Sequence, residues 1–227
     1  MGSVSGGFVA LLLVAAACGG GDITPANSSG IRPTGSDALV SVMRGTGESS
    51  DYDPHDSPAD LGDRASVTVT GTITAVDDGR VFGVGPTRHD EPAFLHLTLT
   101  VQVDRVLAGN KSLIRDGLVY VEIARTKELP VETFRNATPE NQRLVLFLDD
   151  YTEGMRTFPV IEEAPSIPDG APVLAPYAEG FLIEDTTSGE LIGGFEDLAE
   201  LPAAWSEAST TIDSFTATHF PNRGPTD

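Results

Sequence analysis

The chain has 227 residues, with 34 acidic and 14 basic side chains, a formal net charge of −20 and a hydrophobic fraction of 40%. A surface of this charge repels a phosphate backbone, so nucleic acid is not expected as a partner, and it repels anionic lipid headgroups as well. The length and the hydrophobic fraction are typical of one globular domain that buries its own core.

The first predicted element is the uncharged apolar segment 8–17. This segment has only ten residues, whereas a helix that crosses a membrane needs about 20. Its length and the small residues at its end are typical of a signal peptide. The segment stops at Cys18, the only cysteine of the chain. Two other interpretations stay open: an ordinary secretory signal in which Cys18 has no role, and a buried helix with a buried thiol in a cytosolic protein.

The sequence Val14-Ala15-Ala16-Ala17-Cys18 resembles the lipobox of bacterial lipoproteins. The resemblance implies that residues 1–17 are a signal peptide and that Cys18 becomes the acylated first residue of the mature chain. The protein would then be lipid-anchored at the extracytoplasmic face of a bacterial cell membrane, and it would contact the membrane through the lipid on Cys18. No basic residue precedes Arg32, which departs from the usual positively charged leader.

Residues 18–37 are rich in Gly, Ser and Pro and predict a disordered tether. The body is predicted as one domain over residues 38–220, followed by a tail at 221–227. Near its start, Ser57, Pro58 and Asp60 provide a capping hydroxyl, a proline at the first helical position and an acidic third residue. This pattern predicts a short N-terminal helix from Pro58 to about Arg64.

Alternating apolar and polar residues then predict strands. The strand segments are 66–76, 95–103, 119–123, 143–149 and a hairpin over 180–192. The first three place aliphatic side chains on one face, and they place His96 and Glu122 on the opposite face, which is predicted to be solvated. The fourth is apolar on both faces and is predicted to be the most buried strand. Residues 77–79 predict a turn.

Near the C-terminus, apolar residues recur at steps of three and four, which predicts one amphipathic helix that flanks the domain. The residues of this stripe are Leu198, Leu201, Trp205, Ala208, Ile212, Phe215 and His219.

The order of the segments GTITAV, LTLTVQVDRVLAGN, VYVEI, RLVLFLDD and GFLIED resembles small exported bacterial domains of the OB-barrel type. Their overall shape is similar to the netrin-like barrels of metalloproteinase inhibitors. The resemblance implies a mainly β fold: a small OB-like barrel of five to seven strands with a short N-terminal helix and a C-terminal amphipathic helix. Those inhibitors act through a free amino-terminal cysteine and a disulfide-bonded edge, which this chain lacks, so inhibition of a metalloproteinase is not implied.

The segment 124–142 interrupts the general acidity of the chain. It carries Arg125, Lys127 and Arg135 together with the aromatic Phe134. Because OB-type barrels bind ligands across one face and its rim loops, we predict a binding rim at these four residues.

Two other groups suggest chemistry. Asp51, Asp53 and Asp56 surround His55 and are candidate ligands for a divalent cation, although the spacing lacks the Gly and Glu of a calcium-binding loop. The alternative interpretation of this group is an acidic loop before the helix. A cell-envelope hydrolase would need His89 or His96 in a pocket with a carboxylate within about 3 Å.

The leading hypothesis is therefore a lipid-anchored, non-catalytic binding or structural module of the cell envelope, with an envelope protein or a wall polymer as its partner. A hydrolase using His89 or His96, and a divalent-cation binder using the three aspartates, are the alternatives. No cofactor is expected, and the sequence leaves the oligomeric state open.

Overall fold

The computed structural model describes residues 35–46, 53–84, 88–154 and 158–221, with the backbone alone at residues 88–91. The chain divides into two units, residues 1–31 and 32–227, and every described residue belongs to the second. The predictions for the signal peptide, for Cys18 and for most of the tether fall outside the described residues. The same is true of Asp51 and of the side chain of His89.

The described residues form seven strands, five α-helices and one short 3-10 helix. In chain order these are α1 (Ser36–Arg44), α2 (Pro58–Arg64), β1 (Val67–Val84), β2 (Arg88–Gly109), η1 (Lys111–Leu113), β3 (Leu118–Arg125), α3 (Val131–Ala137), β4 (Arg143–Asp150), β5 (Val160–Glu162), β6 (Val173–Glu184), β7 (Leu191–Gly193), α4 (Ala203–Ser206) and α5 (Ile212–His219).

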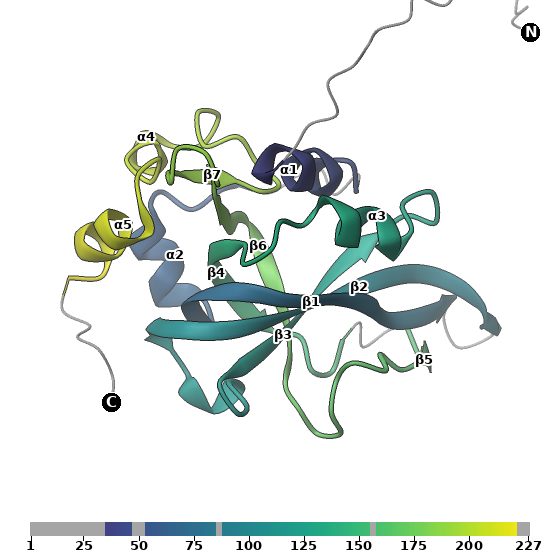
Figure 1. Cartoon of the computed structure of the whole chain (residues 1–227). Coiled ribbons are helices and arrows are strands. Elements are labelled where there is room, and N and C mark those ends of the chain that lie inside the picture. The colour runs from purple at the N-terminus through teal and green to yellow at the C-terminus, as the bar shows by residue number, and fades with distance from the viewer. Residues whose placement is uncertain (1–34, 47–52, 85–87, 155–157, 222–227) are drawn as a thin grey trace, which may run out of the picture. The chain divides into compact units, whose positions relative to one another are not determined.

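Five of the strands close into a ring in the order β1–β2–β3–β6–β4–β1. The pair β3–β6 is parallel, with Tyr120 opposite Val173, and the other four pairs are antiparallel. β5 pairs with the far end of β1, and β7 pairs with the end of β6. This closed ring confirms the predicted mainly β fold and the small OB-like barrel (Figure 1).

β1 and β2 are much longer than predicted, with 18 and 22 residues. Their pairing contains several register shifts, and such shifts bend and twist a ribbon. β1 therefore pairs with β4 over residues 67–72 and with β5 at Val81 and Phe82. The predicted turn at residues 77–79 is wrong, because Asp77 pairs with Thr98 and Asp78 with Leu97 inside the ribbon.

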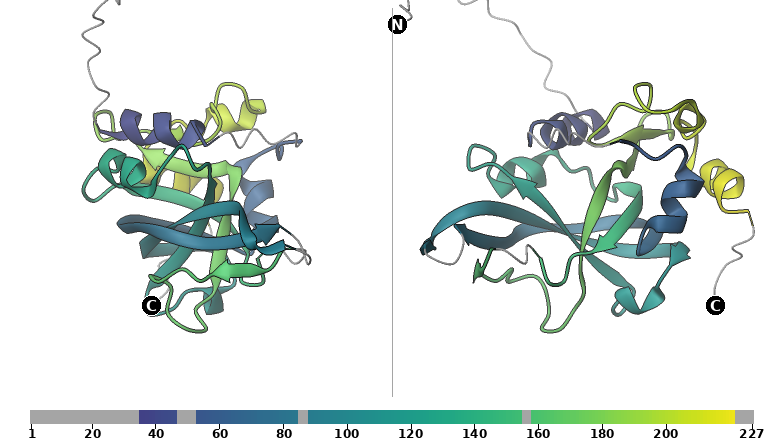
Figure 2. Two further views of the ribbon diagram at one scale, coloured as in Figure 1. Left: turned by 90° about the vertical axis from the view of Figure 1, so that its right-hand side faces the viewer. Right: turned by 180° about the vertical axis from the view of Figure 1, so that it is seen from behind.

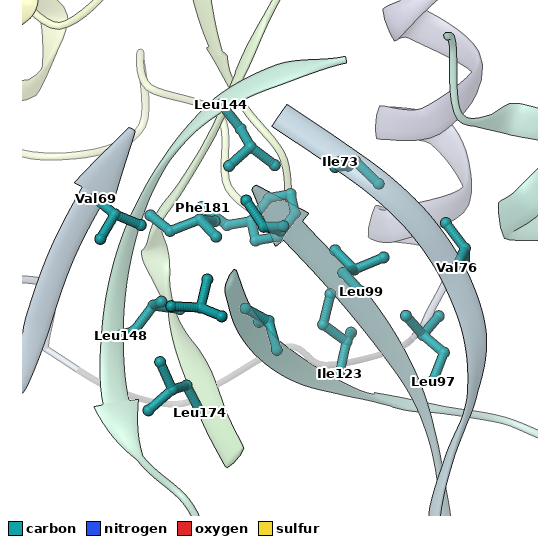
Figure 3. Packing of buried hydrophobic residues seen from close by; sticks show 14 of the residues in the cluster. Val69, Ile73, Val76, Leu97, Leu99, Ile123, Leu144, Leu148, Leu174 and Phe181 are labelled. Atoms are coloured by element: carbon teal, nitrogen blue, oxygen red, sulfur yellow. The ribbon is translucent and has the colours of Figure 1, made fainter. Parts of the chain in front are cut away.

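The interior of the barrel is filled by aliphatic residues and Phe181, which meet from all five strands of the ring (Figure 3). Helical residues complete this cluster: Leu39 and Met43 from α1, Leu113 from η1, and Val131 and Phe134 from α3. A second buried cluster contains residues of α2, α4 and α5, with Trp205, Phe147 and Phe215 at its centre.

β4 separates these two clusters. Leu144, Leu146 and Leu148 belong to the barrel interior, whereas Val145 and Phe147 belong to the outer cluster. The five residues are completely buried, which agrees with the prediction of a strand that is apolar on both faces.

The helices agree with the sequence in part. α2 has the predicted bounds, and the Ser57 hydroxyl accepts a hydrogen bond from the Asp60 N–H at 3.1 Å. α1 was not predicted, and it begins at Ser36, inside the segment predicted as a tether. The Ser36 hydroxyl oxygen lies 3.1 Å from both Gln142 Oε1 and the Glu184 carbonyl oxygen, so its one proton serves these two acceptors and ties this helix to the strands.

The C-terminal stripe forms two short helices instead of the predicted single one, as the separate α4 and α5 ribbons show (Figure 2). The carbonyl oxygen of Thr210 accepts a hydrogen bond from Leu191 N–H of β7, and the Thr211 side chain caps α5. A helix is interrupted where its main-chain groups bond elsewhere. The burial of Trp205, Ile212 and Phe215 is nevertheless as the stripe predicts.

Candidate functional site

A β-bulge in β1 organises the polar residues on the outer face of the barrel. Asp78 pairs with Leu97 and Val81 with Leu95, so Gly79 and Arg80 together face His96. A Cβ atom at Gly79 would lie 2.9 Å from backbone carbon atoms of His96 and Leu97, so the close approach of the two strands requires glycine here.

The bulge directs the main chain of Arg80 to side-chain partners. The Arg80 N–H donates to Glu122 Oε1 at 2.8 Å, and the Arg80 carbonyl oxygen lies 3.2 Å from His96 Nδ1. Glu122 and His96 are both buried. Predicted to be solvated, they instead satisfy main-chain groups that the bulge has removed from the regular ladder.

The Arg80 guanidinium pairs with the same carboxylate. Its Nε and Nη2 lie 2.9 and 2.8 Å from Glu122 Oε2, and the side chains are only 6% and 0% exposed. Nη1 donates to the Thr152 carbonyl oxygen and Nη2 to that of Tyr151, each at 2.9 Å. This buried ion pair therefore fastens the segment after β4 across the outer face of the ribbon.

Burial lowers the pKa of His96, and this effect outweighs the nearby negative charge of Glu122, which raises it. The imidazole packs against the rings of Phe82 and Tyr151, with centroid distances of 5.2 and 6.2 Å. Because the partner of Nδ1 is a carbonyl oxygen, Nδ1 carries the proton and donates it. The Nδ1 hydrogen bond of His96 thus goes to a main-chain oxygen, whereas the hydrolase hypothesis needs a carboxylate as the partner.

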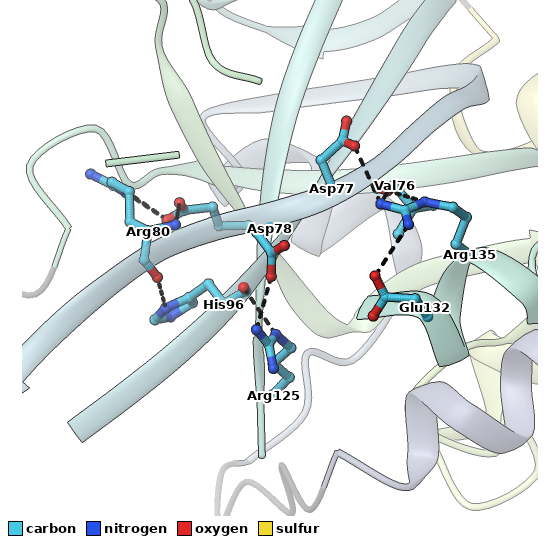
Figure 4. A network of polar contacts seen from close by, with 9 residues as sticks. Val76, Asp77, Asp78, Arg80, His96, Arg125, Glu132 and Arg135 are labelled. Atoms are coloured by element: carbon cyan, nitrogen blue, oxygen red, sulfur yellow. Dashed lines mark hydrogen bonds and ion pairs between the residues drawn. The ribbon is translucent and has the colours of Figure 1, made fainter. Parts of the chain in front are cut away.

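The structure separates the four residues of the predicted rim. Phe134 is buried in the barrel core, so its predicted place on a binding surface is wrong: its side chain closes the barrel from α3. Lys127 is 83% exposed and lies 3.8 Å from Glu128. Only Arg125 and Arg135 reach a common element, the stretch of β1 from Val76 to Asp78 (Figure 4).

These two arginines are bound to β1 in different ways. Arg125 donates to the His96 carbonyl oxygen at 3.2 Å and to Asp78 Oδ1 at 3.0 Å. Arg135 donates through Nε and Nη2 to the Val76 carbonyl oxygen, at 3.1 and 2.9 Å. Arg135 also lies 3.5 Å from a carboxylate oxygen of Asp77 and of Glu132.

A groove of about 430 Å³ lies beside Arg135. One wall is β1, and the other is the connection between α3 and β4. The lining residues are Ile73, Thr74, Ala75, Val76, Arg135, Thr138, Pro139, Glu140 and Asn141. The groove is thus the part of the predicted rim that offers a concave surface.

The candidate metal ligands do not form a cation site in the described residues. Asp53 and Asp56 are exposed, and no group of three His, Cys, Asp or Glu side chains in the described ranges could hold a metal ion. His55 instead pairs with the buried Glu179 of β6, with Nδ1 2.7 Å from Oε1. Trp205 Nε1 donates to the His55 carbonyl oxygen at 2.8 Å. His55 therefore connects the chain before α2 to both β6 and α4.

Arg80, Glu122 and Glu179 are the charged residues that sequence reasoning missed. An isolated glycine inside a strand pattern is a known sign of a bulge, and Gly79 next to Arg80 could have indicated one. No local signal indicates Glu179, whose partner His55 lies 124 positions away.

Comparison with family models, curated proteins and solved structures gives no match to this chain. Among the described residues, no helix combines the length and the apolarity needed to span a membrane.

The Arg80–Glu122 pair gives a first prediction. Glu122→Gln should lower the free energy of unfolding by about 3–5 kcal/mol, because it leaves the Arg80 charge buried without a counter-charge. The matched control, Glu132→Gln, removes an exposed partner of Arg135 and should cost less than about 1 kcal/mol. Urea denaturation measures both, and equal losses would contradict the role assigned to the buried pair.

His96 gives a prediction on pH. A histidine whose pKa is lowered by folding binds protons more weakly in the native state, so stability is full above the ordinary pKa of about 6.5 and falls as the pH drops below it. His96→Asn keeps an N–H donor but does not titrate. Unfolding curves between pH 8 and pH 5 should show a smaller loss of stability for His96→Asn than for the native chain. A parallel decline of both proteins would rule this out.

Proposed function

We propose that this protein is a lipid-anchored module of the bacterial cell envelope that binds an envelope protein or a wall polymer and carries out no reaction. Two features support the two parts of this proposal. The short apolar segment that ends at Cys18, with a Gly-rich segment after it, supports the anchor. The groove beside Arg135 supports the binding role, and it is the observation that carries the proposal.

The groove lies where a binding surface is expected on such a fold. It opens at the rim of an OB-like barrel, and barrels of this type use rim loops and the adjacent strands to hold extended ligands. One wall, residues 73–76, is main chain of a strand that the barrel itself holds in place. A rigid wall loses little conformational freedom when a ligand binds, which favours affinity.

The buried charged groups support a binding role over catalysis. Arg80, Glu122 and His96 bond to one another and to main-chain atoms. His55 and Glu179 hold the segment before α2. In each case the polar atoms make hydrogen bonds that hold two segments of the fold together, which is a structural role.

The anchor is tested on the native protein. The mature chain should begin at Cys18, be heavier than its bare polypeptide by the mass of its acyl chains, and sediment with membranes. Cys18→Ser should remove the acyl mass and release the protein into the soluble fraction, whereas Ser28→Ala should change neither. Mass spectrometry that finds residues 1–17 intact and no acyl group would falsify the anchored assignment.

The binding role is tested by photo-crosslinking in cells. A photoreactive amino acid in place of Glu140, at the groove, should give discrete adducts with envelope components. The control position is Asp213, which is exposed on α5 at the opposite end of the domain from α3 (Figure 1). If position 140 gives no more adducts than position 213, the groove is not a binding surface.

A further inference from the structure

We infer that the edge of β1 over residues 74–78 is a docking site for an extended basic peptide, which would add to the barrel as an extra strand. This inference rests on the binding role proposed above for the same groove. It names the class of partner, a polypeptide segment with lysine or arginine side chains, and the mode of its attachment through main-chain hydrogen bonds.

The edge is open because β4 and β5, which pair with β1 on the side away from β2, stop short of it at its two ends. β4 pairs with β1 only as far as Thr72 opposite Arg143, after which Ile73 N–H donates to the Gln142 carbonyl oxygen at 2.9 Å. β5 pairs only with Val81 and Phe82. Across the intervening residues, no strand in the described ranges pairs with this side of β1.

The connection before β4 explains why the ladder ends there. Pro139 has no N–H to donate to a neighbouring strand. Asn141 adopts a left-handed conformation with φ of 57°, which turns the chain and which asparagine tolerates better than most residues. The chain therefore leaves β1 and forms the opposite wall of the groove.

Alternate main-chain groups of the edge point away from β2. The Val76 carbonyl oxygen bonds to Arg135 and so faces away from β2. Since residues of an antiparallel pair alternate in direction, Asp78 presents its N–H and C=O to the same side. From Gly79 onward the bulge directs the main chain to Glu122 and His96. Five residues remain, which span roughly 17 Å at about 3.4 Å per residue.

Arg135 acts as a latch on this edge. Its guanidinium covers the Val76 carbonyl oxygen, the acceptor that an added strand would use. Charged side chains commonly protect strand edges from indiscriminate pairing in this way. Because Asp77 and Glu132 also lie 3.5 Å from the guanidinium, it can leave Val76 and keep ionic partners. The latch can thus open for a ligand without leaving its charge unpaired.

The local charge selects the partner. Four carboxylates and two guanidinium groups lie at the edge, on α3, on the connection after α3 and at the end of β3: Asp77, Asp78, Glu132 and Glu140, against Arg125 and Arg135. The excess of negative charge favours lysine or arginine side chains on an incoming strand. It disfavours a second copy of this chain, whose net charge of −20 is the same.

The experiment uses the full mature chain and a synthetic ten-residue peptide of alternating valine and lysine. Two further peptides of the same sequence carry N-methyl groups on the odd or on the even residues, with no change in charge. A strand pairs along one edge through alternate N–H groups, so one methylated peptide should bind about tenfold or more weakly and the other should bind nearly as well as the parent. A peptide of alternating valine and glutamate should bind far more weakly than the lysine peptide.

Variants of the protein test the same contact from the other side. Asp78→Pro removes both the carboxylate and the edge N–H, whereas the control Asp78→Ala removes the same carboxylate, with its ion pair to Arg125, and keeps the N–H. Affinity for the lysine peptide should fall about tenfold or more in Asp78→Pro relative to Asp78→Ala. Arg135→Ala opens the latch and should leave affinity equal or higher. A large loss in Arg135→Ala would mean that Arg135 itself contacts the ligand, which contradicts the latch.

The outcomes separate this inference from the proposed function. Equal binding of both methylated peptides would show electrostatic adhesion alone and would overturn strand addition. A failure of the lysine peptide to bind would also overturn strand addition. If adducts at position 140 persist in either case, the binding role stands with another mode of attachment. If those adducts are absent as well, both proposals fail. The peptide arms use the unaltered protein, so they decide the question even if Asp78→Pro does not fold.

Discussion

The bulge at Gly79 and Arg80 is the constraint on which the outer face of the barrel depends. Two residues of β1 oppose one residue of β2, so the main-chain N–H and C=O of Arg80 leave the regular ladder. Buried main-chain groups must find partners, and here Glu122 and His96 provide them. A buried carboxylate in turn needs a counter-charge, which the Arg80 guanidinium supplies. The remaining donors of that guanidinium hold Tyr151 and Thr152, so one local irregularity fixes the segment that covers the ribbon.

The barrel wall also separates two apolar clusters, which explains why so little of the sheet is solvated. Side chains from the ring fill the interior, and α2, α4 and α5 cover part of the outside. Together they bury enough aliphatic and aromatic surface to hold the domain without a disulfide, since the chain has no cysteine after Cys18. The segment before α2 is held to this outer layer by His55, whose carbonyl oxygen bonds to Trp205 and whose imidazole pairs with Glu179.

The same strand closes the ring and borders the groove. β1 is fixed at one end of its open edge by the bond from Ile73 to Gln142, and at the other end by the bulge. The edge between these two points is therefore rigid although no strand in the described ranges lies against it. Arg135 protects it with a bidentate contact that an incoming backbone can replace. A rigid strand edge with a removable cover is suited to a specific and reversible partner.

Local sequence patterns determined much of the framework. The capping hydroxyl of Ser57 located α2, the doubly apolar segment 143–149 located the most buried strand, and the turn residues between 184 and 190 located the β6–β7 hairpin. These succeeded because capping, strand alternation and turn chemistry depend on neighbours in the chain. The order of strand segments was also sufficient to predict a small closed β fold.

Only the tertiary structure decided which polar residues are buried and which are free. His96 and Glu122 have the period of a solvated strand face, yet long-range contacts accompany their burial: Tyr151 packs against His96, and Arg80 pairs with Glu122. Phe134 and Arg135 are adjacent in sequence, but the turn of α3 directs one into the core and the other to the edge of β1. The C-terminal stripe is buried as predicted, but it forms two helices instead of one, because the Thr210 carbonyl oxygen accepts a hydrogen bond from Leu191 N–H. In each case a long-range contact outweighed a local preference, and such contacts leave no periodic trace in the sequence.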